Sequence, residues 1–287
     1  RSGEETENEL SRTLFSVPTL DAVLLDNGLL YFRFTSINDA TGTRMTELLG
    51  TYADSSVTGY IFDLRGVSSG VYSSVSSIVS RFVDAGEIAS AVYKNNSTRI
   101  VAETEGSGFT NLPISIIIDE KTGGSAELIA EALRDHGGGT TVGETSSGNG
   151  TLLETRTFND GTAIEISVAT IRPSAENGYY NGVGITPEFL VEYDGEYETD
   201  PTQYAGSGDM QLRKAVEVIA SKAAAAGTAK FMSYSSARGN WVVIDHGNGW
   251  YTDYQHLSSC VAERGSTWSV AQGDVIGYAG ATGTVYG

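Results

Sequence analysis

The sequence predicts an α/β domain with a mixed sheet and crossover helices, followed by a small all-β domain. Three observations support this architecture. Apolar runs alternate with segments of helical periodicity in the first half of the chain, a strand–turn–strand pattern follows Gly150, and the composition changes near Lys230. We therefore expect a polar N-terminal segment, an α/β domain and a β domain at residues 1–26, 27–226 and 227–287.

Strands and helices alternate along the first domain. Short apolar runs predict buried strands at 29–35, 59–66, 113–119 and 140–145. Apolar residues repeat on one helical face at 43–53, 71–83 and 125–137. Such alternation implies βαβ crossovers and a sheet with helices on its faces.

The pattern changes after Gly150. An Asn-Asp-Gly turn at 159–161 separates two alternating segments, which predicts a β-hairpin within 152–172. A last helix is expected at 210–226, and Gly227 marks a domain boundary. Beyond it, tryptophans, glycine turns and short alternating runs indicate the all-β unit.

The charge and the cysteine content exclude several classes of function. The net charge of −18 disfavours a nucleic-acid partner, because phosphate contacts need clustered Lys and Arg. It also disfavours docking on an anionic membrane surface, and no apolar run has the length of a bilayer span. Cys260 is the single cysteine, so the chain forms no internal disulfide. We expect any targeting signal to precede Arg1.

Motifs in the first domain resemble those of the C-terminal-processing (tail-specific) serine peptidases of family S41, over about residues 27–222. The motifs occur in the family's order: "GYIFDLRG", "SAELIAEALRDHG", "VGETSSGNG", "NDGTAIEISVATIRPS" and "NGVGITPEFLVE". The family's usual PDZ module is not visible in the sequence. The resemblance implies a serine nucleophile that is activated by a neutral lysine of lowered pKa.

Transfer of the motif residue by residue gives no catalytic dyad. With Glu127 as the anchor, the nucleophile position falls on Gly124 and the lysine position on Asn149. Glycine has no side chain to attack with, and an asparagine amide is not a base near neutral pH. The resemblance places the oxyanion region of the cleft at Gly66 and Gly70.

Ser125 is the remaining candidate for a nucleophile. It follows the expected position by one residue, and our main interpretation of it is a helix N-cap. A reactive Ser125 would need a base. Lys121 reads as a solvated loop charge, and His136 as a histidine that complements the helix dipole.

The second domain resembles the middle of LytM-type zinc peptidases of family M23. The segments are "ARGNWVVIDHGNGWYTDYQHLSS" and "VAQGDVIGYAGATGTVYG". His256 matches a histidine that assists catalysis in that family, and His246 is a second remnant of the site. The early and late zinc-binding motifs are absent from the sequence, so we expect no metal and no other cofactor.

The leading hypothesis is a catalytically inactive peptidase fold, a pseudopeptidase, that binds an extended polypeptide or a peptidoglycan component. Two alternatives are an active serine endopeptidase with Ser125 as nucleophile and a structural subunit of an extracellular assembly. A homo- or hetero-oligomer is compatible with each. Aromatic residues of the second domain are candidates for a binding surface or for packing: Trp241, Trp250, Tyr251 and Tyr254. Both resemblances suggest a bacterial cell envelope or extracellular location.

Overall fold

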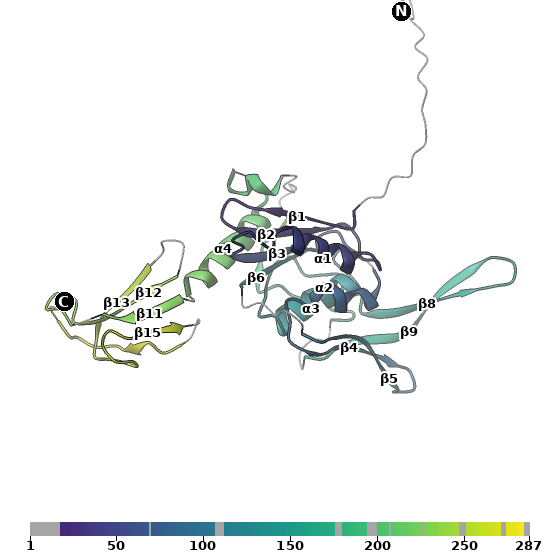
Figure 1. Ribbon diagram of the computed structural model, residues 1–287. Helices are drawn as coiled ribbons and strands as arrows, with labels where there is room; N and C mark the ends of the chain where they lie inside the picture. The colour runs from purple at the N-terminus through teal and green to yellow at the C-terminus, as the bar shows by residue number, and fades with distance from the viewer. Residues whose placement is uncertain are drawn as a thin grey trace, which may run out of the picture.

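The computed structural model describes ten segments of the chain (Figure 1): residues 18–68, 70–106, 112–175, 180–193, 200–206, 208–225, 227–232, 234–246, 251–270 and 274–283. For residues 204–206 and 221–225 only the backbone is described. None of the described helices is both long and apolar enough to cross a bilayer.

The first domain is built on a six-stranded mixed sheet in the order β1-β2-β3-β6-β7-β10. Its strands are β1 (Leu20–Leu24), β2 (Leu29–Phe34), β3 (Gly59–Asp63), β6 (Ile114–Ile118), β7 (Thr140–Gly143) and β10 (Phe189–Leu190). Only β1 runs antiparallel to its neighbour, so the predicted mixed sheet is confirmed.

The prediction of a polar segment through residue 26 is wrong for β1. Residues 20–24 pair with β2, and Leu20 is fully buried. The strand "LDAVL" has only five residues and includes an aspartate, so its weak alternation did not distinguish it from a loop.

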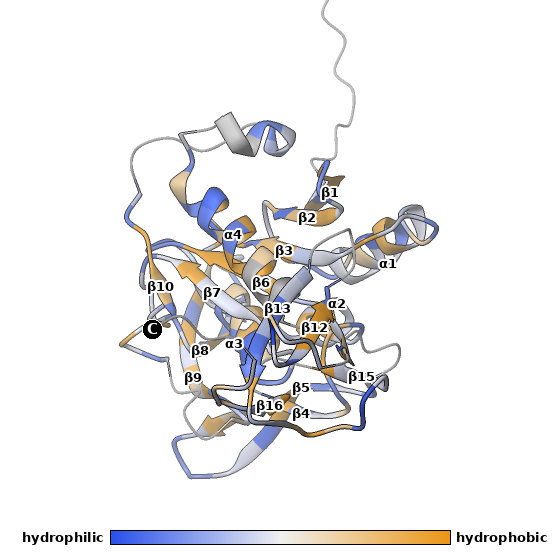
Figure 2. Cartoon of the chain, turned by 90° about the vertical axis from the view of Figure 1, so that its left-hand side faces the viewer, coloured by the Kyte–Doolittle hydropathy of each residue, from blue (hydrophilic) through white to orange (hydrophobic). Residues whose placement is uncertain are grey.

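Helices cover both faces of this sheet. Helices α1 (Thr41–Thr51), α2 (Val75–Val79) and α3 (Ser125–Asp135) pack on one face, and α4 (Met210–Ala225) packs on the other. Figure 2 shows hydrophobic and hydrophilic stripes along α4.

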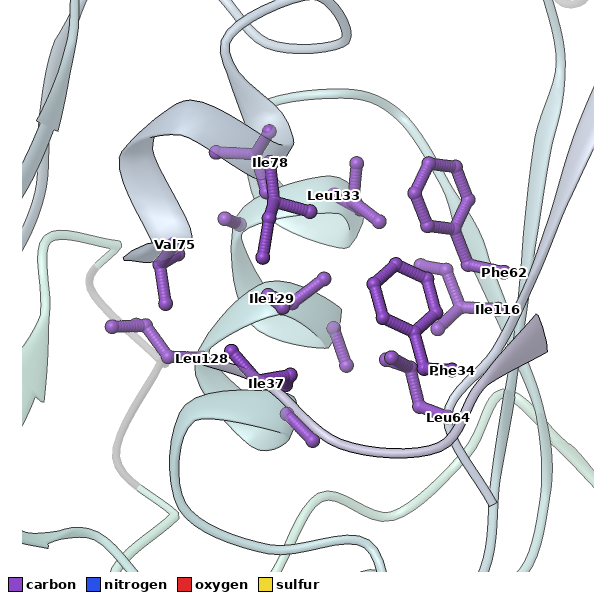
Figure 3. Close-up of a cluster of buried hydrophobic side chains, with 14 of the residues drawn as sticks. Phe34, Ile37, Phe62, Leu64, Val75, Ile78, Ile116, Leu128, Ile129 and Leu133 are labelled. Carbon is purple, nitrogen blue, oxygen red and sulfur yellow. The ribbon is translucent and has the colours of Figure 1, made fainter. Parts of the chain in front are cut away.

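The two cores follow from strand alternation, because successive side chains of a strand point to opposite faces. Phe62 and Ile116 join the core under α1–α3, whereas Ile61 and Ile117 join the core under α4. In Figure 3, side chains of α2 and α3 meet the sheet residues Phe34, Phe62 and Ile116, together with Leu64, which directly follows β3.

The predicted helix at 71–83 is shorter than expected. A 3₁₀ turn at Tyr72–Ser74 precedes α2, which ends at Val79. Serine hydroxyls in this segment offer the backbone alternative partners; for example, Ser77 Oγ donates to the carbonyl of Ser74.

A second, four-stranded sheet has the order β5-β4-β9-β8. Strands β8 (Thr151–Thr157) and β9 (Ala163–Pro173) form the predicted hairpin, which projects from the body in Figure 1. Strands β4 (Gly86–Tyr93) and β5 (Thr98–Thr104) form a second hairpin that we did not predict. Because β5 and β8 are the edge strands, each has backbone groups that no other described strand pairs.

The C-terminal region is all-β, as predicted. Its main sheet has the antiparallel order β13-β12-β11-β15: β11 (Gly227–Phe231), β12 (Asn240–Asp245), β13 (Tyr251–Leu257) and β15 (Thr267–Val270). A two-stranded ribbon, β14 (Ser259–Cys260) with β16 (Gly277–Tyr278), lies beside it. The buried core here is small, and consists of Ala229, Phe231, Val242, Ile244, Leu257 and Val270.

Candidate functional site

A groove of about 580 Å³ lies between the second sheet and the segment that follows β3. The residues lining it are Gly70, Val71, Tyr72, Ser73, Arg99, Ile100, Val101, Gly124, Asn149, Thr151, Leu152 and Leu153. The groove therefore brings together three positions predicted from the sequence: Gly124, Asn149 and Gly70. Gly66, the fourth, does not line it.

The turn at Gly124 connects β6 to α3 and has an unusual backbone conformation. Gly124 has φ 62° and ψ −122°, a region that L-residues with a side chain adopt only under strain. Sharp, strained strand-to-helix turns of this kind present the nucleophile in other hydrolases. Here the turn is present, but the residue at its apex has no side chain.

Glu127 holds the turn and the Asn149 loop together. Its buried carboxylate accepts the amides of Gly124, Gly148 and Asn149 at 3.0, 2.7 and 2.8 Å, and also the hydroxyl of Ser146. Burial raises the pKa of Glu127, while these hydrogen bonds oppose the rise. One carboxylate thus fixes the spacing between two walls of the groove.

The predicted N-cap at Ser125 is wrong by one position. Helix α3 begins at Ser125, Gly124 is its N-cap, and Glu127 satisfies the Gly124 amide. The Ser125 side chain is 0% exposed, and its Oγ has no hydrogen-bond partner among the described residues. A methyl group built on Gly70 would lie 2.3 Å from this Oγ, so the hydroxyl packs against the Gly70 backbone. Ser125 does not line the groove.

The two glycines of the predicted oxyanion region differ in their contacts. The Gly66 amide donates to both carboxylate oxygens of Asp119, at 3.0 and 3.1 Å. Gly70 forms a parallel bridge with Ile37 and lines the groove. A donor already bound to a carboxylate is not free to stabilise a developing oxyanion, so this geometry favours Gly70 over Gly66.

A buried ion network anchors the start of the Gly66–Gly70 segment. The Arg65 guanidinium lies 2.6 Å from Asp63 and 2.9 Å from Asp209, and all three side chains are at most 1% exposed. Arg33 also contacts Asp63, at 2.7 Å. Burial alone would raise the pKa of Asp63, but Arg65 and Arg33 lower it to about 2. Because Asp209 also accepts the Leu212 amide in the first turn of α4, the network joins this segment to the helix on the opposite face.

Tyr72 joins the same segment to the Asn149 loop. Its hydroxyl donates to the carbonyls of Asn149 and Thr151 at 3.3 and 3.4 Å, and burial raises its pKa to about 12.

The described lining residues include no His, Lys, Asp or Glu. Neither candidate base lines the groove: Lys121 is exposed. His136 lies beyond the far end of α3, about 16 Å along a helix of 11 residues, and its Nε2 contacts Ser174.

Comparison with known protein families identifies the family of the chain. Residues 28–191, more than half of the chain, match the model of peptidase family S41. The chain belongs to peptidase family S41. Residues 210–287 match the model of peptidase family M23, in agreement with the second resemblance.

Two relatives illustrate the similarity of the chain to S41 peptidases. The carboxy-terminal processing protease CtpA of Bacillus subtilis is 25% identical over 64% of the chain and 39% of its own length. The chloroplastic carboxyl-terminal-processing peptidase 2 of Arabidopsis thaliana is 25% identical over 55% of the chain and 31% of its own length. The S41 chain thus spans well under half of each relative.

Solved structures agree on the fold. The photosystem II D1 C-terminal processing protease superposes with a TM-score of 0.54 at 18% identity, over 63% of the S41 chain and 50% of its own. A lipoprotein from Streptococcus agalactiae gives a TM-score of 0.54 at 17% identity, over 71% and 70%.

The histidines of the C-terminal sheet make local hydrogen bonds. His246 Nε2 contacts Thr252 Oγ1 at 2.8 Å, and His256 Nδ1 contacts the carbonyl of Thr282 at 2.8 Å. Within the described segments, no cluster of three or more His, Cys, Asp or Glu side chains is arranged to hold a metal ion. Among the aromatic candidates, Trp241 packs under Arg238 at 4.5 Å.

The other aromatic candidates differ in exposure. Tyr251 and Tyr254 are exposed, at 61% and 44%. Trp250 lies outside the described residues.

Sequence reasoning missed Tyr72, Arg99 and Ser146. Tyr72 lies within the helix predicted at 71–83 but was not given a role, and β5, which carries Arg99, was not predicted at all. Ser146 lies in the quoted segment "VGETSSGNG", but its contact with Glu127 joins residues 19 positions apart.

Proposed function

We propose that this protein is a non-catalytic member of family S41 that binds an extended polypeptide in the groove. The observation that carries the proposal is the content of the groove. The turn and the loop are held together by Glu127, yet their apices carry Gly124 and Asn149. Neither residue supplies a nucleophile or a base.

The walls of the groove suit an extended chain. Strands β5 and β8 are both sheet edges, and a bound peptide can add to such an edge through main-chain hydrogen bonds. Apolar side chains on the walls are well exposed: Val71, Ile100 and Leu153 at 39, 49 and 51%. Exposed apolar residues gathered in a hollow favour a ligand with apolar side chains of its own.

The active-endopeptidase alternative needs Ser125 as its nucleophile. The Ser125 hydroxyl is buried against Gly70, and no group able to act as a general base is among the described residues lining the groove. Attack by Ser125 would require the first turn of α3 to unwind, which would also release the Gly124 amide from Glu127. These contacts favour the binding role.

For the whole protein, we extend the proposal to the C-terminal region. Its similarity to family M23 suggests a binding or assembly role at a cell envelope, with a peptidoglycan component as a candidate ligand. The exposed Tyr251 and Tyr254 support a contact surface there. We retain the division of the chain near residue 227 as part of this proposal.

The test combines cleavage and binding. A fluorescently labelled unfolded protein is incubated with the protein, with its Ser125→Ala variant and with a zinc-treated sample, while binding is followed by fluorescence anisotropy. We expect saturable binding without turnover in all three samples. Turnover that Ser125→Ala abolishes would establish the endopeptidase instead, and turnover that appears only with zinc would place an activity in the C-terminal region.

The binding signal needs a control for the groove. Leu153→Glu adds a charge to one wall of the groove, whereas Ile166→Glu adds the same charge to an exposed position of the projecting hairpin. Binding in the groove is lost in the first variant and kept in the second. Equal loss in both, or in neither, would contradict binding at this site.

A further inference from the structure

Arg99 differs in charge from every other described residue of the groove lining. It lies in the edge strand β5 opposite Ala91, and it is the only charged side chain among the described lining residues. The whole chain carries 36 acidic and 18 basic residues. A groove with one cation and no carboxylate is therefore the reverse of the chain's average charge.

Arg99 is also without an internal counter-ion. It makes no ion pair and no side-chain hydrogen bond with any residue in the part of the chain that the structure describes. By contrast, Arg33, Arg65 and Arg134 each contact at least one carboxylate. The Arg99 guanidinium carries five N–H donors, and none of the described residues accepts a hydrogen bond from it.

We infer that Arg99 binds a carboxylate of the peptide that occupies the groove. This inference rests on the proposed function and adds a charge preference to it. A guanidinium fork matches a carboxylate with two parallel hydrogen bonds, and the apolar wall at Ile100 and Leu153 weakens competition from water. The carboxylate can be the C-terminus of the peptide or an Asp or Glu side chain.

The position of Arg99 on β5 fits this assignment. The far end of the strand is tied to α2, because the Glu103 amide donates to Ser76 Oγ at 3.1 Å. Residues Arg99–Val101 lie before that tie and line the groove. A peptide added along this edge would therefore pass Arg99 at the open end of the strand.

The experiment uses three labelled octapeptides of alternating valine and serine. One ends in an amide, one ends in a free carboxylate, and one carries a central glutamate and ends in an amide. We expect one or both of the carboxylate peptides to bind about two- to fivefold tighter than the neutral amide, as for a partly solvated ion pair. The peptide that gains affinity identifies the source of the carboxylate.

Arg99→Gln should remove this preference, so that the neutral and carboxylate peptides bind equally well. The matched control is Arg172→Gln, in strand β9 of the same sheet, because Arg172 lines a different hollow beside Tyr93. The control should keep the full preference, and Arg99→Glu should reverse it.

Two results would overturn the inference. Equal binding of the neutral and carboxylate peptides to the unmodified protein would refute the role of Arg99 while the proposed peptide binding stands. Failure of all three peptides and of the unfolded protein to bind would reject the proposed function, and the charge preference with it.

Discussion

The two peptidase-like regions differ in how their sites are held. In the first domain, Glu127 and the Asp63–Arg65–Asp209 network fix the groove, and none of these residues occupies the nucleophile or lysine position. In the C-terminal region, the His246 and His256 rings contact Thr252 Oγ1 and the Thr282 carbonyl, respectively.

Loss of the reactive groups therefore has different structural consequences in the two regions. A serine peptidase site can lose its nucleophile and base while separate residues keep its shape. A zinc site is ordered by the ligands that bind the metal, so loss of ligands also removes the order. We therefore expect a preformed binding groove in the first domain and none of comparable order around the two histidines.

The largest expected effect is that of Arg65→Met. Removal of the guanidinium leaves Asp63 and Asp209 buried without it, which should lower the free energy of unfolding by about 3–5 kcal/mol. Urea denaturation followed by far-UV circular dichroism measures this loss.

The tryptophans sharpen that test, because all three lie in the C-terminal region: Trp241, Trp250 and Trp268. Their fluorescence should report a transition that Arg65→Met shifts much less. The control Arg156→Met removes an exposed ion pair and should cost less than about 1 kcal/mol. Equal shifts by both probes would mean that the two regions unfold as one unit.

Glu127→Gln should have the next largest effect. The amide keeps the size of the side chain but places an NH₂ group among four donors, so we expect a loss of about 2–3 kcal/mol in the free energy of unfolding. Peptide binding should weaken as well, since the turn and the Asn149 loop lose their common acceptor.

The control for this variant is Glu154→Gln, whose carboxylate pairs with Arg156 on the exposed hairpin. Chemical denaturation and peptide anisotropy should both be nearly unchanged in it. Unaltered peptide binding by Glu127→Gln would show that the groove does not depend on this carboxylate.

Gly124→Ala tests the backbone of the turn with a smaller change. A side chain at φ 62° and ψ −122° costs about 1–3 kcal/mol of strain, which should appear as a lower urea midpoint. Gly50→Ala in helix α1 is the opposite control, because no atom lies within 4 Å of the added methyl and a helix favours alanine by about 1 kcal/mol. A neutral Gly124→Ala would mean that the turn relaxes to an ordinary conformation.

The central strands and the hairpin could be predicted because their signals are local. A fully buried and largely apolar run such as 114–118 and an Asn-Asp-Gly turn each specify structure over a few residues. Strands β4 and β5 lacked such a signal. Their turn places Asn96 at φ 63°, and most of β5 is exposed, so neither burial nor glycine marked the hairpin.

The site was only partly predictable for a related reason. The positions of Gly124 and Asn149 follow from motif order, but the contacts that shape the groove join distant segments. Arg65 meets Asp209 across 144 positions, and Tyr72 reaches Asn149 across 77. Sequence periodicity does not predict pairs that are so far apart along the chain. The burial of Ser125 Oγ likewise follows from its packing against Gly70, which only the structure shows.

The last prediction is a pH dependence of the stability of the first domain. Burial raises the pKa of Glu131 to about 8, helped by a hydrogen bond that the protonated Glu131 carboxyl donates to neighbouring Asp135 and opposed by the charge of Arg134. The folded state then holds a proton that the unfolded state releases above its ordinary pKa of 4.5. The contribution of Glu131 to stability is therefore full below about pH 4.5 and declines as the pH rises toward 8.

Glu131→Gln, which imitates the protonated form, should flatten this decline. Urea midpoints between pH 5 and 8 measure the slope by circular dichroism, and the exposed Glu47→Gln should keep the original slope. Tryptophan fluorescence should show no change in slope for either variant, since Glu131 lies in α3 and the tryptophans lie beyond α4. If Glu131→Gln leaves the slope unchanged, the titrating proton belongs to another group. If the variant changes the slope of the tryptophan signal, the stability of the C-terminal region depends on that of the first domain.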